Sequence, residues 1–137
     1  MRLRKSTEYS IRCLVYMAQR ADDLSSVKHL SKTLKIPYKF LARLMTELSR
    51  GGIVQSVRGK NGGYRIAHPL EDITLSDIIS VVEGEEDTKR CILGFDECDD
   101  EHPCALHEFW RGPRQHVIDM ENTVTLAHLA ANRGTRL

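Results

Sequence analysis

The sequence lacks an apolar run that could cross a membrane. Across its 137 residues, no such run approaches the roughly 20 residues that a transmembrane helix needs. The basic residues near the start are not followed by the apolar segment of a signal peptide, and there are no internal repeats or low-complexity segments. These absences argue against a membrane protein and predict a soluble, cytoplasmic chain of ordinary single-domain size.

The sequence also has few aromatic residues and lacks a catalytic motif. Aromatic residues make up only 6% of the chain, against 41% apolar residues in total, so the core should be mostly aliphatic. A catalytic constellation is also missing. Cys104 and His107 could act as nucleophile and base on spacing alone, but no third residue orients them and no oxyanion motif accompanies them. We therefore expect that the chain is not an enzyme and has no catalytic residues.

What the sequence does contain is a strong segregation of charge. Residues 1–68 hold fourteen Lys and Arg against four Asp and Glu, a net charge of +10. Residues 69–108 hold two against thirteen, a net charge of −11, and residues 109–137 hold four against two, a net charge of +2. Ten excess positive charges in half of a small domain predict a polyanionic partner, because a merely solvated surface intersperses the two signs.

The basic half has the pattern of a winged helix-turn-helix. Apolar residues at helical spacing predict three helices, for which Ser25-Ser26 and Pro37 supply starts and Gly51-Gly52 an end. Two alternating segments around a glycine-rich basic turn then predict a β-hairpin, the wing. Thr7 is expected to cap the first helix. The expected helices and strands are 7–21, 25–34, 37–50, 53–57 and 64–67.

This arrangement predicts double-stranded DNA as the partner. The third helix fits the major groove, and the wing tip can reach phosphates or the minor groove. The alternative is a glycine turn that merely closes a hairpin with surface lysines. The candidate DNA-contacting residues are Arg2, Lys5, Lys28, Tyr38, Lys39, Ala42, Arg43, Arg58, Lys60, Asn61, Gly62 and Tyr64.

The second half divides into a helix, a loop and a long helix. Thr74 and Asp77 resemble a capping box for a helix that ends near Gly84, and helical spacing resumes over about 103–122 and after Thr125. The long helix is too apolar to project alone, so we expect a twin helix in a two-fold dimer, with packing back onto the same subunit as the alternative. The expected fold is mainly α with a small β-wing. It comprises a DNA-binding domain over 1–84, a cysteine-rich loop over 85–106, and a dimerisation helix with a short final helix over 107–137.

The loop holds three of the four cysteines together with a histidine, in the spacing C-x6-C-x5-C-x2-H: Cys91, Cys98, Cys104 and His107. In a cytoplasmic protein, clustered cysteines favour metal binding or redox chemistry over structural disulfides. Soft thiolates with an imidazole suit an Fe–S cluster or zinc, and the residues alone leave both open. Reversible disulfides among the three are a further alternative. Cys13 is expected to be a small buried residue, and the acidic residues of the loop are expected to be solvated.

Three groups of motifs together match a known family pattern. They are Met1–Lys5 with Glu8-Tyr9, Ser56–Gly59 with Gly62–Tyr64, and the three loop cysteines with His107 and Trp110. On these motifs, over nearly its whole length, the chain resembles the Rrf-type winged-helix iron–sulfur transcription regulators, the IscR- and NsrR-like proteins. One departure is Ala42, which stands where the IscR-like recognition helix carries a glutamate.

The resemblance implies a ligand set for the loop. The three loop cysteines would be thiolate ligands of an Fe–S cluster, with 2Fe–2S favoured, 4Fe–4S possible and zinc as the alternative metal. The fourth ligand would be His107, as in IscR-like members, or Glu8 from the first helix of a partner subunit, as in NsrR-like members.

These expectations combine into one functional hypothesis. The chain is predicted to be a homodimeric transcription regulator, mainly a repressor, that binds a roughly palindromic operator. Its cluster would respond to redox state, nitric oxide or iron, and gain or loss of the cluster would change the affinity for DNA. The alternatives are a winged-helix regulator with a structural zinc and one with a thiol–disulfide switch at the same cysteines.

Overall fold

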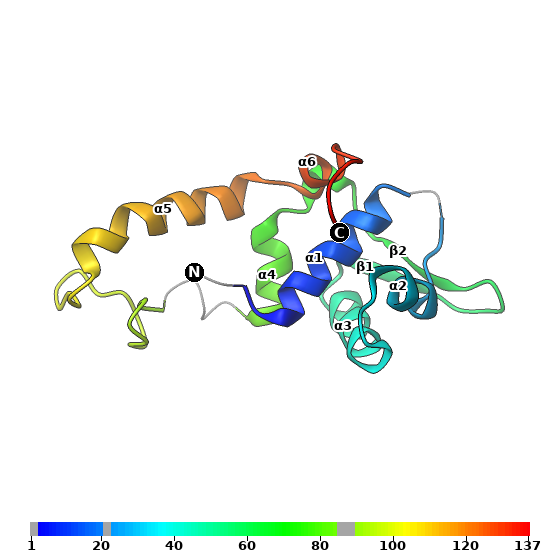
Figure 1. The fold of residues 1–137 in the computed structure, drawn as a ribbon, viewed down its shortest axis with the longest axis horizontal. Coiled ribbons are helices and arrows are strands. Elements are labelled where there is room, and N and C mark those ends of the chain that lie inside the picture. Colours follow the sequence, from blue (N-terminus) through cyan, green and yellow to red (C-terminus); the bar gives the residue numbers. More distant parts are fainter. Residues whose placement is uncertain (1–2, 21–22, 85–89) are drawn as a thin grey trace.

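A computed structural model describes residues 3–20, 23–84 and 90–137. A body contains the helix-turn-helix, the wing and α4, and one long helix, α5, extends from the cysteine loop to this body (Figure 1). The elements in chain order are α1 (Lys5–Ala18), α2 (Val27–Leu34), α3 (Tyr38–Arg50), β1 (Val54–Val57), β2 (Gly63–Ile66), the 3-10 helix η1 (Leu70–Asp72), α4 (Leu75–Glu83), α5 (His107–Thr123) and α6 (Leu126–Ala130).

The core is built around α1. This helix packs against α2, α3, α4 and α6, and its second half is buried continuously from Cys13 to Ala18. Leu30, Leu41 and Ile78 reach it from α2, α3 and α4 and are fully buried. The expected mostly aliphatic core and the burial of Cys13 are therefore confirmed.

The helix-turn-helix forms where the sequence predicts it. The side chain of Ser26 caps α2 by accepting the backbone N–H of His29 at 3.1 Å. Lys35 ends this helix in the left-handed conformation, at φ 55°, and the Ser31 hydroxyl bonds to the carbonyl of Ile36 at 2.6 Å across the turn. Helix α3 then begins directly after Pro37.

The wing is a two-stranded antiparallel hairpin that is fastened to the start of α2. Val54 pairs with Ile66 and Val57 with Gly63. A separate bridge joins Ser25 to Tyr64 through two backbone hydrogen bonds of 2.9 and 2.8 Å. The expected mainly α fold with a small β-wing is confirmed.

The end of the chain is joined to the body at two threonines, each of which also begins a helix with a capping box. Thr74 and Asp77 form one at the start of α4, and Thr125 and His128 form the other at the start of α6. The two threonines face each other in an isolated antiparallel bridge. The end of α5 is therefore joined directly to the start of α4.

The first helix differs from its prediction. It begins at Lys5, two residues before the expected cap, and ends at Ala18. Thr7 is fully buried inside it, and its hydroxyl bonds to the carboxylate of Glu83 at the end of α4. The predicted cap at Thr7 is wrong because a tertiary partner takes its side chain. The long helix begins at His107 rather than near residue 103, with Pro113 inside it.

Candidate cysteine pocket and DNA-binding surface

The loop after residue 90 folds into a pocket at the free end of α5. A turn closes at Cys91, where its N–H donates to the carbonyl of Phe95 at 3.1 Å and its carbonyl accepts from Gly94 at 2.9 Å. Gly94 is at φ 89°, a conformation that favours glycine. The pocket has a volume of about 450 Å³, and its lining includes all three loop cysteines, His107, Phe95 and His102.

Two of the cysteines interact directly. The pKa of the Cys91 thiol is lowered, chiefly because the backbone N–H of Leu93 hydrogen-bonds to its sulfur and also because Cys104 donates to it. The pKa of Cys104 is raised, chiefly because it keeps the proton in this hydrogen bond and secondly because it is desolvated. Cys91 is therefore the cysteine of this pair that becomes a thiolate first, which is the form that binds soft metals.

His107 lines the same pocket as the three cysteines. It is the first residue of α5, and its backbone N–H donates to the backbone carbonyl of Cys104 at 3.0 Å. The imidazole is 5% exposed, with Nδ1 at 3.6 Å from the sulfur of Cys98 and Nε2 at 2.9 Å from Oδ1 of Asp100. Three thiols and one ring nitrogen thus line one pocket, as the C-x6-C-x5-C-x2-H spacing predicts.

The acidic residues of the loop have separate roles. Asp99 accepts the N–H of Glu101 at 2.8 Å and contacts His102 at 3.0 Å. The pKa of Asp99 is lowered, chiefly by the hydrogen bond from the backbone N–H of Glu101. Asp100 contacts His107 instead. Sequence reasoning missed this contact, because the spacing of Asp100 from the ligand candidates carries no recognisable signal.

The other ligand candidate lies apart from the pocket. Glu8 is on α1, where its carboxylate pairs with Lys5 at 2.9 Å, and it is not among the residues that line the pocket. A role for Glu8 would need a second copy of the chain. Among the described residues, no group of three or more His, Cys, Asp and Glu side chains is arranged to hold a single metal ion.

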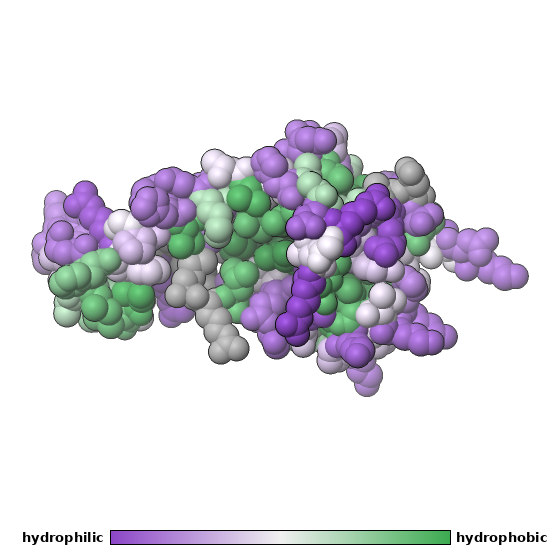
Figure 2. Space-filling model, turned by 45° about the horizontal axis from the view of Figure 1, so that its top comes forward, coloured by the Kyte–Doolittle hydropathy of each residue, from purple (hydrophilic) through white to green (hydrophobic). Residues whose placement is uncertain are grey.

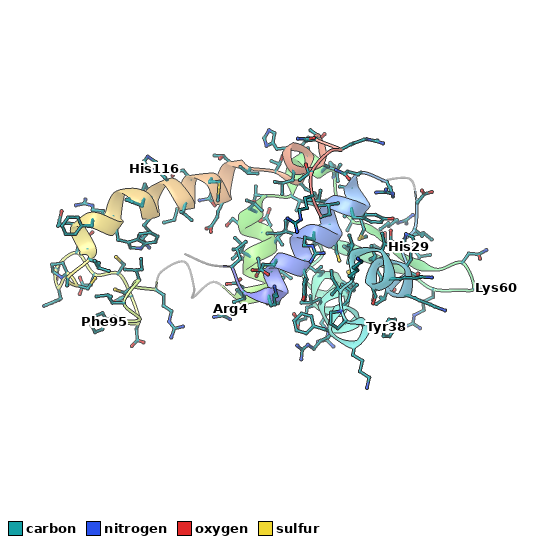
Figure 3. All side chains as sticks on the ribbon, viewed as in Figure 1. Arg4, His29, Tyr38, Lys60, Phe95 and His116 are labelled. Carbon is teal, nitrogen blue, oxygen red and sulfur yellow. The ribbon has the colours of Figure 1, made fainter. Side chains whose placement is uncertain are left out.

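The predicted DNA-contacting residues lie at the opposite end of the molecule. Figure 3 shows Tyr38 at the start of α3 and Lys60 at the wing tip, both far from Phe95 in the loop. Ala42 is half-buried and Tyr64 packs partly against the core. Arg2 lies outside the described residues, and Lys5 pairs with Glu8 on α1. The predicted DNA-contacting residues whose side chains are exposed on α2, α3 and the wing are Lys28, Tyr38, Lys39, Arg43, Arg58, Lys60 and Asn61.

The wing and recognition helix, joined to a separate cysteine pocket, match one family of known proteins. The family model for Rrf2, described as an iron-dependent transcriptional regulator, matches residues 3–132. The chain belongs to the Rrf2 family. It is accordingly a DNA-binding transcription regulator and not an enzyme.

Known members support this assignment along the whole Rrf2 chain. A protein of Aquifex aeolicus, named as an HTH-type transcriptional regulator, is 32% identical over 90% of the chain and 88% of its own length. IscR of Pectobacterium atrosepticum is 28% identical over 97% of the chain and 81% of its own length. Among solved structures, CymR, the global cysteine regulator of Bacillus subtilis, matches with a TM-score of 0.81 at 26% identity over 96% of the chain and 97% of its own.

None of the described helices of this Rrf2 chain is long and apolar enough to cross a bilayer.

Proposed function

We propose that this Rrf2 chain is a homodimeric regulator, mainly a repressor, whose affinity for its operator is set by an Fe–S cluster in the cysteine pocket. The observation that carries the proposal is the donor set: three thiols and one buried imidazole line a single pocket of about 450 Å³. The lowered pKa of Cys91 favours the thiolate that such a group requires.

Each donor has a defined task. Cys91, Cys98 and Cys104 would supply the thiolates, and His107 the fourth donor. The cluster, when bound, would supply a group that responds to redox state, nitric oxide or iron supply. A 2Fe–2S cluster fits one histidine among the ligands, because imidazole replaces thiolate in known clusters of that type.

A single helix, α5, connects the cysteine pocket to the DNA-binding body. Helix α5 begins at His107, inside the pocket, and ends beside Val124, whose carbonyl accepts the N–H of Leu75 on α4 at 3.0 Å. The N–H of Leu126 donates to the carbonyl of Ile73 at 2.7 Å. A change in how the loop holds the start of α5 would therefore act on the element that packs against α1 and α3.

On DNA, α3 would lie in the major groove and the wing would lie beside it. Lys39 and Arg43 on α3 would contact the DNA directly, while Arg58 and Lys60 would contact phosphates. In a two-fold dimer the operator is then roughly palindromic, with half-sites about one helical turn apart.

The first test is chemical analysis of protein purified without oxygen. We expect a brown protein that contains iron and acid-labile sulfide, with several visible bands if the cluster is 2Fe–2S and one broad shoulder if it is 4Fe–4S. Cys104→Ser should lose the colour, whereas Cys13→Ser should keep it. A colourless wild-type protein with one zinc per chain would contradict the cluster and support the structural-zinc alternative.

The second test measures control of DNA binding. A palindromic site is selected from a random pool with the cluster-loaded protein, and its affinity is compared for loaded and cluster-free protein at one salt concentration. We expect a difference of at least tenfold, which is within the range of 5- to 150-fold for typical coupling between sites. Equal affinities would overturn cluster control while leaving DNA binding intact.

One observation favours a thiol switch as the second candidate function. Cys91 and Cys104 are hydrogen-bonded to each other, so two thiols that could form a disulfide are already adjacent. Loss of DNA binding in cluster-free protein after treatment with peroxide, reversed by a reductant and absent in Cys104→Ser, would support this alternative.

A further inference from the structure

We infer that Asp100 is a positioning residue that fixes which nitrogen of His107 faces the cysteines. The inference deepens the proposed function, since it rests on His107 as the fourth donor of the pocket. It assigns a task to a carboxylate that sequence spacing gives no reason to single out.

The geometry determines the tautomer of His107. A carboxylate only accepts hydrogen bonds, so Nε2, at 2.9 Å from Oδ1 of Asp100, must carry the proton. In the neutral ring Nδ1 is then unprotonated, and its lone pair lies on the side of Cys98, whose sulfur is 3.6 Å away. The opposite tautomer would place two acceptors, Nε2 and the carboxylate, against each other.

Among the described residues of the loop, His107 is the hydrogen-bond partner of the Asp100 carboxylate, whereas the neighbouring Asp99 carboxylate has two other partners. Asp99 is occupied by the N–H of Glu101 and by His102. The chain between Cys98 and Cys104 bends over residues 100–102, and Asp100 lies against His107 at the start of α5. The imidazole is almost fully buried while the Asp100 side chain is 76% exposed, so the carboxylate closes the outer side of the ring.

This arrangement is the one found around metal-bound histidines. A ligating imidazole almost always donates its other ring N–H to a carboxylate, a carbonyl or water, which orients the ring and makes the ligand nitrogen more basic. Loss of such a partner typically costs 10- to 100-fold in metal affinity or activity. Asp100 would therefore affect how firmly the pocket holds its group without being a ligand.

The first experiment uses cluster-free protein and depends on no cofactor. The ¹⁵N chemical shifts of His107 are recorded at about pH 8.5, where an ordinary imidazole is neutral, for wild type, Asp100→Ala and the control Glu101→Ala. The control removes one negative charge from the adjacent exposed position. We expect wild type and the control to show the Nε2–H tautomer and Asp100→Ala to show a mixture. The same single tautomer in all three proteins would overturn the inference.

The second experiment uses protein reconstituted without oxygen. Wild type, Asp100→Asn, Asp100→Ala and Glu101→Gln are compared by visible spectrum, midpoint potential and rate of iron loss to a chelator. We expect iron loss to be about 10- to 100-fold faster in Asp100→Ala, and the potential to rise more in Asp100→Asn than in Glu101→Gln. The carboxamide of Asp100→Asn keeps an acceptor, so its iron loss should be intermediate.

Failure of the proposed cluster function and failure of the role of Asp100 give different results. A wild-type protein that binds no iron and sulfide contradicts the proposed function, and the tautomer measurement still decides the role of Asp100. A wild-type cluster with an Asp100→Ala variant that matches Glu101→Gln in spectrum, potential and iron loss contradicts the inference alone.

Discussion

Two acidic side chains meet where α5 joins the body. Glu121 is 5% exposed, and its pKa is raised from the ordinary 4.5, chiefly because burial disfavours its charge and secondly because Glu83 is near. Glu83 is itself held by the backbone N–H of Arg4 at 3.1 Å, by the Arg4 guanidinium at 3.8 Å and by the hydroxyl of Thr7. Burial and the nearby Glu83 carboxylate therefore both disfavour the charged form of Glu121 in the folded protein.

The raised pKa of Glu121 gives a prediction with a definite sign. Because the folded state binds this proton more tightly than the unfolded chain, the stability it contributes is complete below about pH 4.5 and is lost as pH rises through the raised pKa. We expect Glu121→Gln to raise the free energy of unfolding at pH 7, with little difference from wild type near pH 4. Urea unfolding at both values checks it. Glu108→Gln, at an exposed position on the same helix, should show no such pH-dependent difference.

The four cysteines should differ sharply in reactivity. Burial raises the pKa of Cys13 to about 12, so it stays protonated and inaccessible. Cys91 is also buried, at 6% exposure, but it lines the pocket together with Cys98 and Cys104. In cluster-free, reduced protein at about pH 8, we therefore expect a thiol reagent to modify the three loop cysteines through the pocket and to reach Cys13 only after denaturation. Titration with Ellman's reagent, with and without guanidinium, counts the thiols. Cys13→Ser should give the same native count, and a lower one would contradict the prediction.

At the level of elements, the wing is positioned by its contact with α2 rather than by its own turn. Gly63 makes this contact possible, since a Cβ at that position would lie 2.8 Å from the carbonyl oxygen of Ser25, closer than any ordinary contact. The bridge between Ser25 and Tyr64 beside it leaves no room for adjustment. The contact between the wing and the start of α2 therefore requires glycine at position 63.

Gly63→Ala should for this reason weaken DNA binding more than it weakens the fold. We expect a loss of about tenfold or more in affinity, corresponding to about 1.4 kcal/mol, with α1 and α3 still folded by circular dichroism. Gly112→Ala is the matched control, because a Cβ there meets nothing within 4 Å. It should leave DNA affinity unchanged and stabilise α5 by roughly 0.5–1 kcal/mol. Equal DNA affinities of the two variants would contradict the role of Gly63.

On the scale of the whole molecule, one apolar patch lies at the loop end, away from the predicted DNA-contacting residues. Figure 2 shows apolar residues gathered at the loop end of the molecule. Phe109 and Met120 on α5 are 78% and 46% exposed, and eleven residues apart they lie on the same face of the helix. The exposed apolar side chains of the loop end are those of Ile92, Leu93, Phe95, Leu106 and Phe109. Such a surface supports the proposed second copy of the chain, because isolated monomers rarely expose contiguous apolar patches.

A charge on this face of α5 should separate the proposed dimer. We expect Met120→Arg to raise the dissociation constant of the dimer by about 100-fold, because an unpaired charge would be buried at the interface. Operator affinity should fall with it, since two recognition helices then no longer bind together. Sedimentation equilibrium and titration with the selected operator measure the two effects. Asn122→Arg, at an exposed position on the other side of α5, is the control. A Met120→Arg variant that remains a dimer would place the interface elsewhere.

The sequence by itself determined the features that depend on neighbouring residues. Apolar spacing set the helices of the helix-turn-helix, and Ser26 and Thr74 capped theirs as predicted, because a cap bonds to a backbone group only two or three residues away. The spacing of the loop cysteines and His107 likewise predicted one shared pocket, since so short a segment keeps its donors close together.

Only the tertiary structure decided the partnerships between distant or irregular segments. Thr7 bonds to Glu83, 76 residues away, instead of capping its own helix. Asp100 contacts His107 because a loop without periodicity bends over residues 100–102. Helical and strand periods specify which side of an element is buried, but they do not specify which polar group it meets there. That choice depends on how the elements pack in three dimensions.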